Sequence, residues 1–180
     1  MQPTAIFDQL QASFAGRVHA LVADSLDPTI LIDKNAVHDI AVTLKSDAAL
    51  AFDFLASISG VDLGDKLQCV YHLYSYRHRQ ALVLKADVPY NDPALPSVVD
   101  VWPAANWLER EQYDLMGLRF TGHPDLRRIM LPEDWVGHPL RKDYQQQASY
   151  HGIDTHRPNP LELLAPPSAT PTTTEAPNAN

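Results

Sequence analysis

Hydrophobic and polar residues follow two different periods along this chain, one typical of helices and one typical of strands. Near the N-terminus Ile6, Leu10 and Phe14 recur at helical spacing, whereas later runs alternate between apolar and polar positions. The first part of the chain is predicted to form a helix that ends near Gly16 and a hairpin of Val18–Val22 with Thr29–Ile32. A helix capped by Asp33 or Asn35 should then run to Asp47. It is followed by a strand Phe52–Ile58, a turn at Gly60, Asp62 and Gly64–Lys66, and a hairpin of Leu67–Tyr76 with Gln80–Val88.

The pattern changes after Pro96. Val98–Trp102 fits a helical turn opened by Ser97 or, because of its valines, a strand, and both alternatives stay open. Trp107–Met116 predicts a short helix that Gly117 ends, and the spacing of Asn106 and Glu109 suits an N-terminal cap. From Leu118 the chain reads as loops interrupted by Gly122, Pro124, Pro132, Gly137 and Pro139.

These elements predict an α+β fold with a mixed, largely antiparallel sheet of four or five strands, helices packed against it, a long loop segment and an extended C-terminal tail. We expect a core domain at 1–103, a signature helix with docking loops continuous with that core at 104–157, and a tail at 158–180. The tail is rich in Pro and Thr and is expected to be disordered at its end. No apolar run approaches the roughly 20 residues of a spanning helix, so no direct membrane span is expected.

Composition and charge exclude several classes of function. The formal net charge is −8, and residues 1–103 hold twelve acidic but only seven basic residues, so nucleic-acid binding is not expected. The single cysteine, Cys69, lies in an apolar run and reads as a small buried residue; alone it can hold neither a disulfide nor a cysteine-ligated cluster. The first ten residues resemble neither a signal peptide nor a transit peptide, which predicts residence in a bacterial-type cytoplasm.

Catalytic and metal-binding patterns are not legible. The eight histidines do not have metal-ligand spacing, and no Walker loop, GxGxxG or GxSxG motif occurs. Gly-His-Pro appears twice, at His123 and His138, and each triplet predicts a rigid corner; that the corners only shape the loop is favoured over contact with a partner's redox site. The carboxylate pairs Glu109/Glu111 and Glu133/Asp134 should point apart.

With no catalytic or metal-binding pattern legible, the residues that remain to be explained are those suited to binding another protein. The stretch 107–143 combines arginines, tryptophans and nearly balanced charges, which is typical of a surface that another protein reads. The candidate docking residues are Glu109, Arg110, Glu111, Asp114, His123, Arg127, Arg128, Trp135, His138, Arg141 and Lys142. Loops this rich in proline have little capacity to bury guanidinium groups, so we expect Arg127, Arg128 and Arg141 to act in docking and hardly at all in stability.

One family shares this arrangement. The run EREQYDLM, followed by His123, Arg127 and Ile129-Met130 and then by LPEDW and GHPLRKDY, resembles the signature of the C subunit of proton-pumping NADH:quinone oxidoreductase, respiratory complex I. The resemblance is firm over 98–144 and implies a hetero-oligomeric, peripheral-arm subunit that scaffolds the large quinone-site subunit and the cluster-bearing subunits. It implies no cofactor in this chain, since iron–sulfur clusters, FMN, NADH and quinone belong to partner subunits.

The resemblance also implies a location on the cytoplasmic side of the bacterial inner membrane, reached through partners. An alternative is the equivalent subunit of a membrane-bound hydrogenase-type energy-converting complex. A free-standing hydrolase is a third possibility from a different class, and it is disfavoured because no pair of nucleophile and base is legible.

Overall fold

The computed structural model describes residues 2–23 and 27–155. The described residues up to 145 form one compact unit, and the described residues 146–155 belong to a second. Of the second unit, the described part contains the short antiparallel pair β8 (Ser149–Tyr150) and β9 (Ile153–Asp154). The predicted tail at 158–180 lies outside the described residues.

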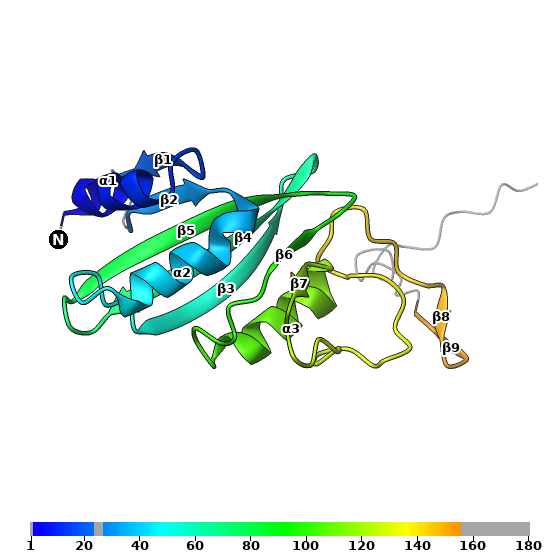
Figure 1. The fold of residues 1–180 in the computed structure, drawn as a ribbon. Helices are drawn as coiled ribbons and strands as arrows, with labels where there is room; N and C mark the ends of the chain where they lie inside the picture. The colour runs from blue at the N-terminus through cyan, green and yellow to red at the C-terminus, as the bar shows by residue number, and fades with distance from the viewer. Residues whose placement is uncertain (1, 24–26, 156–180) are drawn as a thin grey trace, which may run out of the picture. The chain divides into compact units, whose positions relative to one another are not determined.

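A five-stranded sheet forms the centre of the first unit (Figure 1). Its order is β1 (Val18–Val22), β2 (Thr29–Ile32), β5 (Gln80–Pro89), β4 (Lys66–Ser75) and β3 (Phe54–Asp62). Every neighbouring pair is antiparallel except β2 and β5, which run parallel. The predicted fold class, a mixed and largely antiparallel sheet with helices, is therefore confirmed, as are both predicted hairpins.

The helices that precede β3 cover one face of this sheet. They are α1 (Pro3–Ser13), the 3-10 turn η1 (Lys34–Ala36) and α2 (Val37–Ser46), which crosses the sheet in Figure 1. Asp33 caps η1, whereas no side chain caps α2, the helix for which the cap was predicted. Apolar residues of both helices and the inward-facing residues of the strands form one core. Cys69 is part of that core, where burial raises the pKa of its thiol to about 12.

The remaining helix lies along the edge of the sheet. In α3 (Ala105–Met116), the side chain of Gln112 accepts a hydrogen bond of 2.7 Å from the backbone N–H of Gly60 on the edge strand β3. A Cβ at Gly60 would stand 2.9 Å from Met116, so the helix packs closely only because this residue is glycine. The turn predicted at Gly60 and Asp62 is wrong, since β3 continues through Asp62.

The ends of α3 show one confirmed prediction and one error. Gly117 ends the helix with a left-handed φ of 74°, as predicted. The helix begins at Ala105, however, and no side chain caps it, so Asn106 and Glu109 do not form the predicted cap. Of the two alternatives for residues 98–102, the structure has the helical turn, in which Trp102 N–H donates to Val98 O.

A two-stranded parallel pair, β6 (Ala94–Pro96) and β7 (Arg119–Thr121), flanks α3 in the sequence. None of the helices in the described ranges is long and apolar enough to cross a membrane.

Candidate functional site

The C-terminal half of α3 holds a buried carboxylate that organises the following loop. Asp114 is fully buried, and its Oδ2 accepts three consecutive backbone N–H groups, from Ile129 at 3.0 Å, Met130 at 2.7 Å and Leu131 at 2.8 Å. Three successive N–H groups that converge on one oxygen form a nest for an anion. We call residues 122–144 the signature loop, and Asp114 is its central anchor.

Arg128 completes this anchor. Its Nη1 lies 2.5 Å from Asp114 Oδ1, and its Nη2 donates to the carbonyl oxygens of Trp135 at 2.9 Å and Gly137 at 3.1 Å. Only 16% of the Arg128 side chain is exposed. The expectation that these loops cannot bury a guanidinium is therefore wrong for Arg128, because the loop folds around the acidic end of α3 and supplies carbonyl acceptors.

Both Gly-His-Pro corners turn their imidazoles inward. Gly122 and Gly137 have φ values of 84° and 83°, as the triplets predict. His138 Nδ1 lies 2.9 Å from the backbone oxygen of Asp114, and His123 Nε2 lies 3.1 Å from that of Asn106. These contacts favour the interpretation that the corners shape the loop.

A second carboxylate, on β3, fixes the end of the signature loop. Asp62 accepts hydrogen bonds from Lys142 N–H at 2.8 Å, Tyr90 O–H at 3.0 Å and Gly64 N–H at 2.8 Å. Arg141 lies over the Tyr90 ring, 4.2 Å from its centroid, and pairs with Asp143. Arg141 is also only 16% exposed, so the expectation that these loops have little capacity to bury a guanidinium group is wrong for Arg141 too.

Both anchors are ionised carboxylates. Burial opposes the charge of Asp114, but the N–H groups of Leu131, Met130 and Ile129 and the Arg128 guanidinium outweigh it, and they lower its pKa below the ordinary value. The pKa of Asp62 is lowered in the same way, since the N–H groups of Lys142 and Gly64 and the Tyr90 hydroxyl outweigh burial. The loop is thus held by buried negative charge.

Glu109, which precedes Asp114 on α3, is buried in a different setting. Its two oxygens accept hydrogen bonds from Ser97 Oγ at 2.6 Å and Val98 N–H at 2.7 Å. No cation pairs with Glu109 among the ion pairs of the described residues. Burial therefore dominates and, with the nearby charge of Asp100, raises the pKa of Glu109 to about 7.

The candidate docking residues divide into internal and outer groups. Three have buried side chains, Glu109, Arg110 and Asp114. Arg110 donates to the backbone oxygens of Arg127 and Arg128, which adds a further hold on the loop. The half-buried ones are Glu111, His123, Arg128, Trp135, His138 and Arg141, and the exposed ones are Arg127 and Lys142. Docking by the accessible members stays a prediction.

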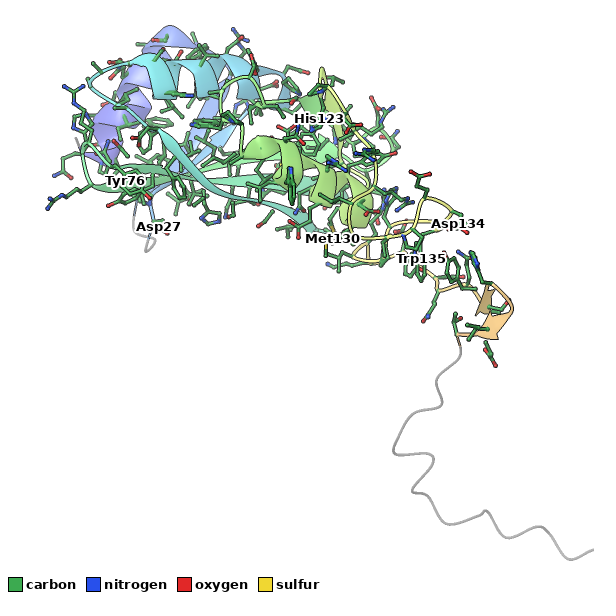
Figure 2. All side chains as sticks on the ribbon, turned by 90° about the horizontal axis from the view of Figure 1, so that it is seen from below. Asp27, Tyr76, His123, Met130, Asp134 and Trp135 are labelled. Atoms are coloured by element: carbon green, nitrogen blue, oxygen red, sulfur yellow. The ribbon has the colours of Figure 1, made fainter. Side chains whose placement is uncertain are left out.

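The structure adds three residues that sequence reasoning did not select. Met130, Val136 and Leu140 are 63%, 63% and 58% exposed, although all are apolar and all lie in the signature loop. Figure 2 shows Met130 and Trp135 on the part of the loop beyond α3. Their apolar character was not considered in the sequence analysis, which selected docking residues by charge and aromaticity. We call these three residues the apolar triad.

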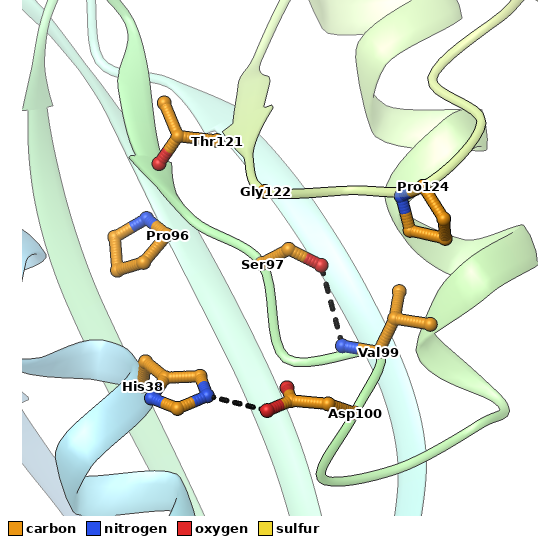
Figure 3. A pocket seen from close by; sticks show the side chains of 8 residues that line it. All are labelled: His38, Pro96, Ser97, Val99, Asp100, Thr121, Gly122 and Pro124. Carbon is orange, nitrogen blue, oxygen red and sulfur yellow. Dashed lines mark hydrogen bonds and ion pairs between the residues drawn. The ribbon is translucent and has the colours of Figure 1, made fainter.

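A pocket of about 470 Å³ lies beside the segment that links β6 to α3 (Figure 3). It is lined by His38, Pro96, Ser97, Val99, Asp100, Thr121, Gly122 and Pro124. His38 Nε2 and Asp100 Oδ2 are 2.8 Å apart at its rim, and the Ser97 hydroxyl is engaged by Glu109. The lining therefore offers no nucleophile paired with a base. Within residues 2–23 and 27–155, no three His, Cys, Asp or Glu side chains converge as metal ligands.

Comparison with known proteins gives one consistent family. The sequence model of the 30 kDa subunit of respiratory-chain NADH dehydrogenase matches residues 30–150. Over 158 residues the chain is 41% identical to the C subunit of NADH-quinone oxidoreductase from Chlorobium phaeobacteroides, a match that covers 84% of this chain and 94% of that protein. It is 42% identical over 147 residues to the protein of the same name from Chloroherpeton thalassium, and the match covers 80% of this chain.

The share of each relative that is covered varies. This chain spans 61% of the length of the Chloroherpeton thalassium protein and 54% of the protein of the same name from Saccharopolyspora erythraea.

Two solved structures have a similar fold. A trypsin-resistant fragment of Nqo5 (1-134) is 30% identical with a TM-score of 0.59, and the match covers 70% of this chain and all of that one. A chain of the membrane-bound sulfane sulfur reductase, an archaeal respiratory membrane complex, has a TM-score of 0.70 over 89% of this chain and 98% of its own. At 21% identity this second match shows a shared fold only.

Proposed function

Because this chain belongs to the family of the 30 kDa subunit of respiratory-chain NADH dehydrogenase, we propose that it is an assembly subunit of NADH:quinone oxidoreductase that binds its neighbours through the signature loop. The neighbours would be the large quinone-site subunit and the subunits that carry iron–sulfur clusters. The chain would reach the cytoplasmic side of the inner membrane through these partners.

One observation carries this proposal: the signature loop is fixed from inside while its apolar triad faces outward. Asp114, Arg128 and Asp62 hold the loop backbone through partly buried hydrogen bonds. A loop whose conformation is already set loses little entropy when a partner binds. Apolar side chains that are more than half exposed gain free energy only when a partner covers them, by about 25 cal/mol for each Å² removed from water.

The proposed role is scaffolding without a cofactor. The single cysteine cannot hold a cluster, and the loop hydrogen bonds engage the polar groups of α3 internally. The purified chain should therefore contain no stoichiometric iron, zinc or flavin, which elemental analysis and an absorption spectrum would test. A visible absorption band that remains after gel filtration would contradict the cofactor-free role.

The alternative of a hydrogenase-type complex differs in its electron donor. The relatives compared above, at about 40% identity, carry the name NADH-quinone oxidoreductase, and this favours NADH. The likeness to the sulfane sulfur reductase concerns the fold and does not favour another donor.

The test replaces the apolar triad with serine (Met130→Ser, Val136→Ser and Leu140→Ser) in the full chain, in cells that lack the native copy. Exposed residues contribute little to the isolated fold, so its melting should change by no more than a few degrees. Loss of three interface anchors should reduce copurifying subunits and membrane NADH:quinone reductase activity by at least about tenfold.

A matched control replaces Val22 and Val42 with serine, since these apolar residues are also exposed but lie on β1 and α2. The control should assemble normally. Full assembly of the triad variant would contradict the proposed docking role, and equal loss in the control would show a general effect of polarity.

A further inference from the structure

The tip of the β4–β5 hairpin carries an exposed aromatic cluster. The Tyr76 ring lies 5.4 Å from the Phe54 ring and 5.2 Å from the Tyr74 ring, measured between centroids. Phe54 and Tyr74 are paired across β3 and β4, so the sheet places both rings where Tyr76 contacts them. Tyr76 is 61% exposed and Phe54 42%, so the cluster leaves much apolar surface in water.

The backbone of this tip is held in place. Tyr76 N–H donates to Asp53 Oδ1 at 3.1 Å, His78 N–H donates to Ser75 Oγ at 3.3 Å, and His78 Nε2 lies 3.0 Å from the carbonyl oxygen of Ala48. Arg79 adopts a left-handed φ of 51°, which closes the turn. The tip is thus pinned to the segment that joins α2 and β3, and its outer side chains are displayed by a fixed turn.

Two arginines at the tip have no acceptor among the described residues. Of the arginines that the structure describes, Arg17, Arg119, Arg127, Arg128 and Arg141 each form an ion pair, and Arg110 donates to two carbonyl oxygens. Arg77 and Arg79 are exposed and take part in no ion pair with a described carboxylate. The carboxylate of Asp53 is engaged by the Tyr76 backbone instead.

We propose that the hairpin tip, defined as Phe54, Tyr74, Tyr76, Arg77 and Arg79, is a second protein interface that binds an acidic segment of another protein. Tyrosine and arginine are the residues that most often carry interface energy. Two unpaired guanidinium groups beside exposed rings fit carboxylates flanked by apolar side chains. Figure 2 shows Tyr76 at the end of the first unit away from Met130 and Trp135, so this surface is separate from the signature loop.

Charge argues against other anionic ligands. A nucleic acid carries a phosphate at every nucleotide and would extend beyond the two arginines over the surface of residues 1–103, which carry twelve acidic and only seven basic residues. Recognition of anionic lipid generally takes clusters of about four to eight Lys and Arg, and the tip has two arginines. Two arginines beside exposed aromatic rings are enough to bind a short peptide segment with two carboxylates.

The experiment places the photo-crosslinking residue p-benzoylphenylalanine at Tyr76 in the full chain, in cells grown at native expression, and at Val42 as the matched exposed position on α2. Crosslinked peptides are mapped by mass spectrometry. We expect a crosslink from position 76, above that from position 42, to a segment of another protein with at least two Asp or Glu residues. The double variant Arg77→Glu/Arg79→Glu should reduce that crosslink at least about tenfold.

Charge controls make the result specific. Arg17→Glu/Arg119→Glu changes the net charge by the same amount at two exposed arginines elsewhere and should leave the crosslink unchanged. The neutral variant Arg77→Gln/Arg79→Gln, whose melting is compared with that of the parent chain, should give an intermediate yield. The apolar-triad variant should keep the crosslink, which separates this proposal from the proposed function.

Four outcomes would overturn the proposal. They are a yield at position 76 no greater than at position 42, a crosslink only to a second copy of this chain, a crosslink that survives charge reversal, and a tip that instead binds phosphatidylglycerol vesicles and loses that binding in the glutamate variant.

Discussion

Two buried carboxylates on one helix behave in opposite ways. Asp114 and Glu109 are both fully buried on α3, yet the pKa of Asp114 is lowered and that of Glu109 is raised to about 7. Asp114 receives three backbone N–H groups and the Arg128 guanidinium, whereas Glu109 receives one N–H and one hydroxyl. Burial is common to both, so the number of donors and the presence of a cation decide the sign of the shift.

The difference separates two regions of the molecule. At the end of α3, buried negative charge holds the signature loop, and that hold persists throughout the neutral pH range. In the middle of α3, a carboxyl group that exchanges its proton near neutrality joins the helix to Ser97 and Val98. We therefore expect pH to affect the β6–α3 link and to leave the loop anchor unchanged.

The largest test removes the charged anchor. Asp114→Ala leaves Arg128 half-buried without its carboxylate and three loop N–H groups without their acceptor. Breaking a buried pair costs about 3–5 kcal/mol, so we expect a loss of that size in the free energy of unfolding. Urea unfolding of the full chain measures it. A loss below about 1 kcal/mol would mean that water can replace the Asp114 carboxylate as acceptor. Asp114 would then not hold the loop, and it would not differ from Glu109 in its structural role.

The second test neutralises the other carboxylate. Because the pKa of Glu109 is raised in the folded chain, the native state binds more protons than the unfolded state, and the free energy of unfolding falls as pH rises from about 4.5 to about 7. Glu109→Gln cannot ionise, so it should gain on the parent chain across this window, by on the order of 3 kcal/mol at pH 8.

Urea unfolding at several pH values checks this difference. Below pH 4.5 the two chains should be nearly equal in stability. A constant difference at all pH values would show that Glu109 does not take up a proton on folding.

Local patterns were sufficient for most of the fold. The β4–β5 hairpin and the β1–β2 hairpin alternate clearly enough to be located within one or two residues. The parallel contact of β2 with β5 could not be predicted, because strand order depends on packing between segments distant in sequence. The end of β3 was predicted wrongly because glycine and aspartate usually mark turns. Here Gly60 donates a hydrogen bond to Gln112 of α3, and Asp62 accepts one from the backbone N–H of Lys142.

The sequence located the candidate site, but it did not distinguish the buried residues of the site from the exposed ones. Charge density identified Asp114, Arg128 and Arg141, yet it assigned them to the surface. Which charges are buried depends on long-range partners such as Asp62 and Tyr90 of the sheet, and no spacing within the loop reveals these. The exposed apolar residues of the loop, such as Met130, were not selected, although exposed apolar surface is the feature that most often marks an interaction site.

A third test asks how closely the loop anchor is packed. Gly117 has a φ of 74°, and a Cβ there would lie 2.6 Å from His138 Cδ2. Gly122 has a similar φ of 84° but no atom within 4 Å of such a Cβ. Gly122→Ala should therefore cost only backbone strain, about 1 kcal/mol, whereas Gly117→Ala should cost about 2 kcal/mol because His138 must also move. Equal losses of stability would mean that His138 moves freely and is not part of the anchor.

The smallest effect is expected at Arg127, the neighbour of the half-buried Arg128. Arg127 pairs with Asp125 at 2.9 Å, but the two side chains are 64% and 52% exposed, and exposed pairs contribute about 0–1 kcal/mol. Arg127→Ala should therefore leave urea unfolding almost unchanged, while Arg128→Ala, which leaves Asp114 buried without its cation, should lose several times more. Assembly of the full complex by the Arg127 variant then reports on docking alone. A large loss of stability in Arg127→Ala would show that the outer part of the loop also supports the fold, and the division between anchor and accessible surface would fail.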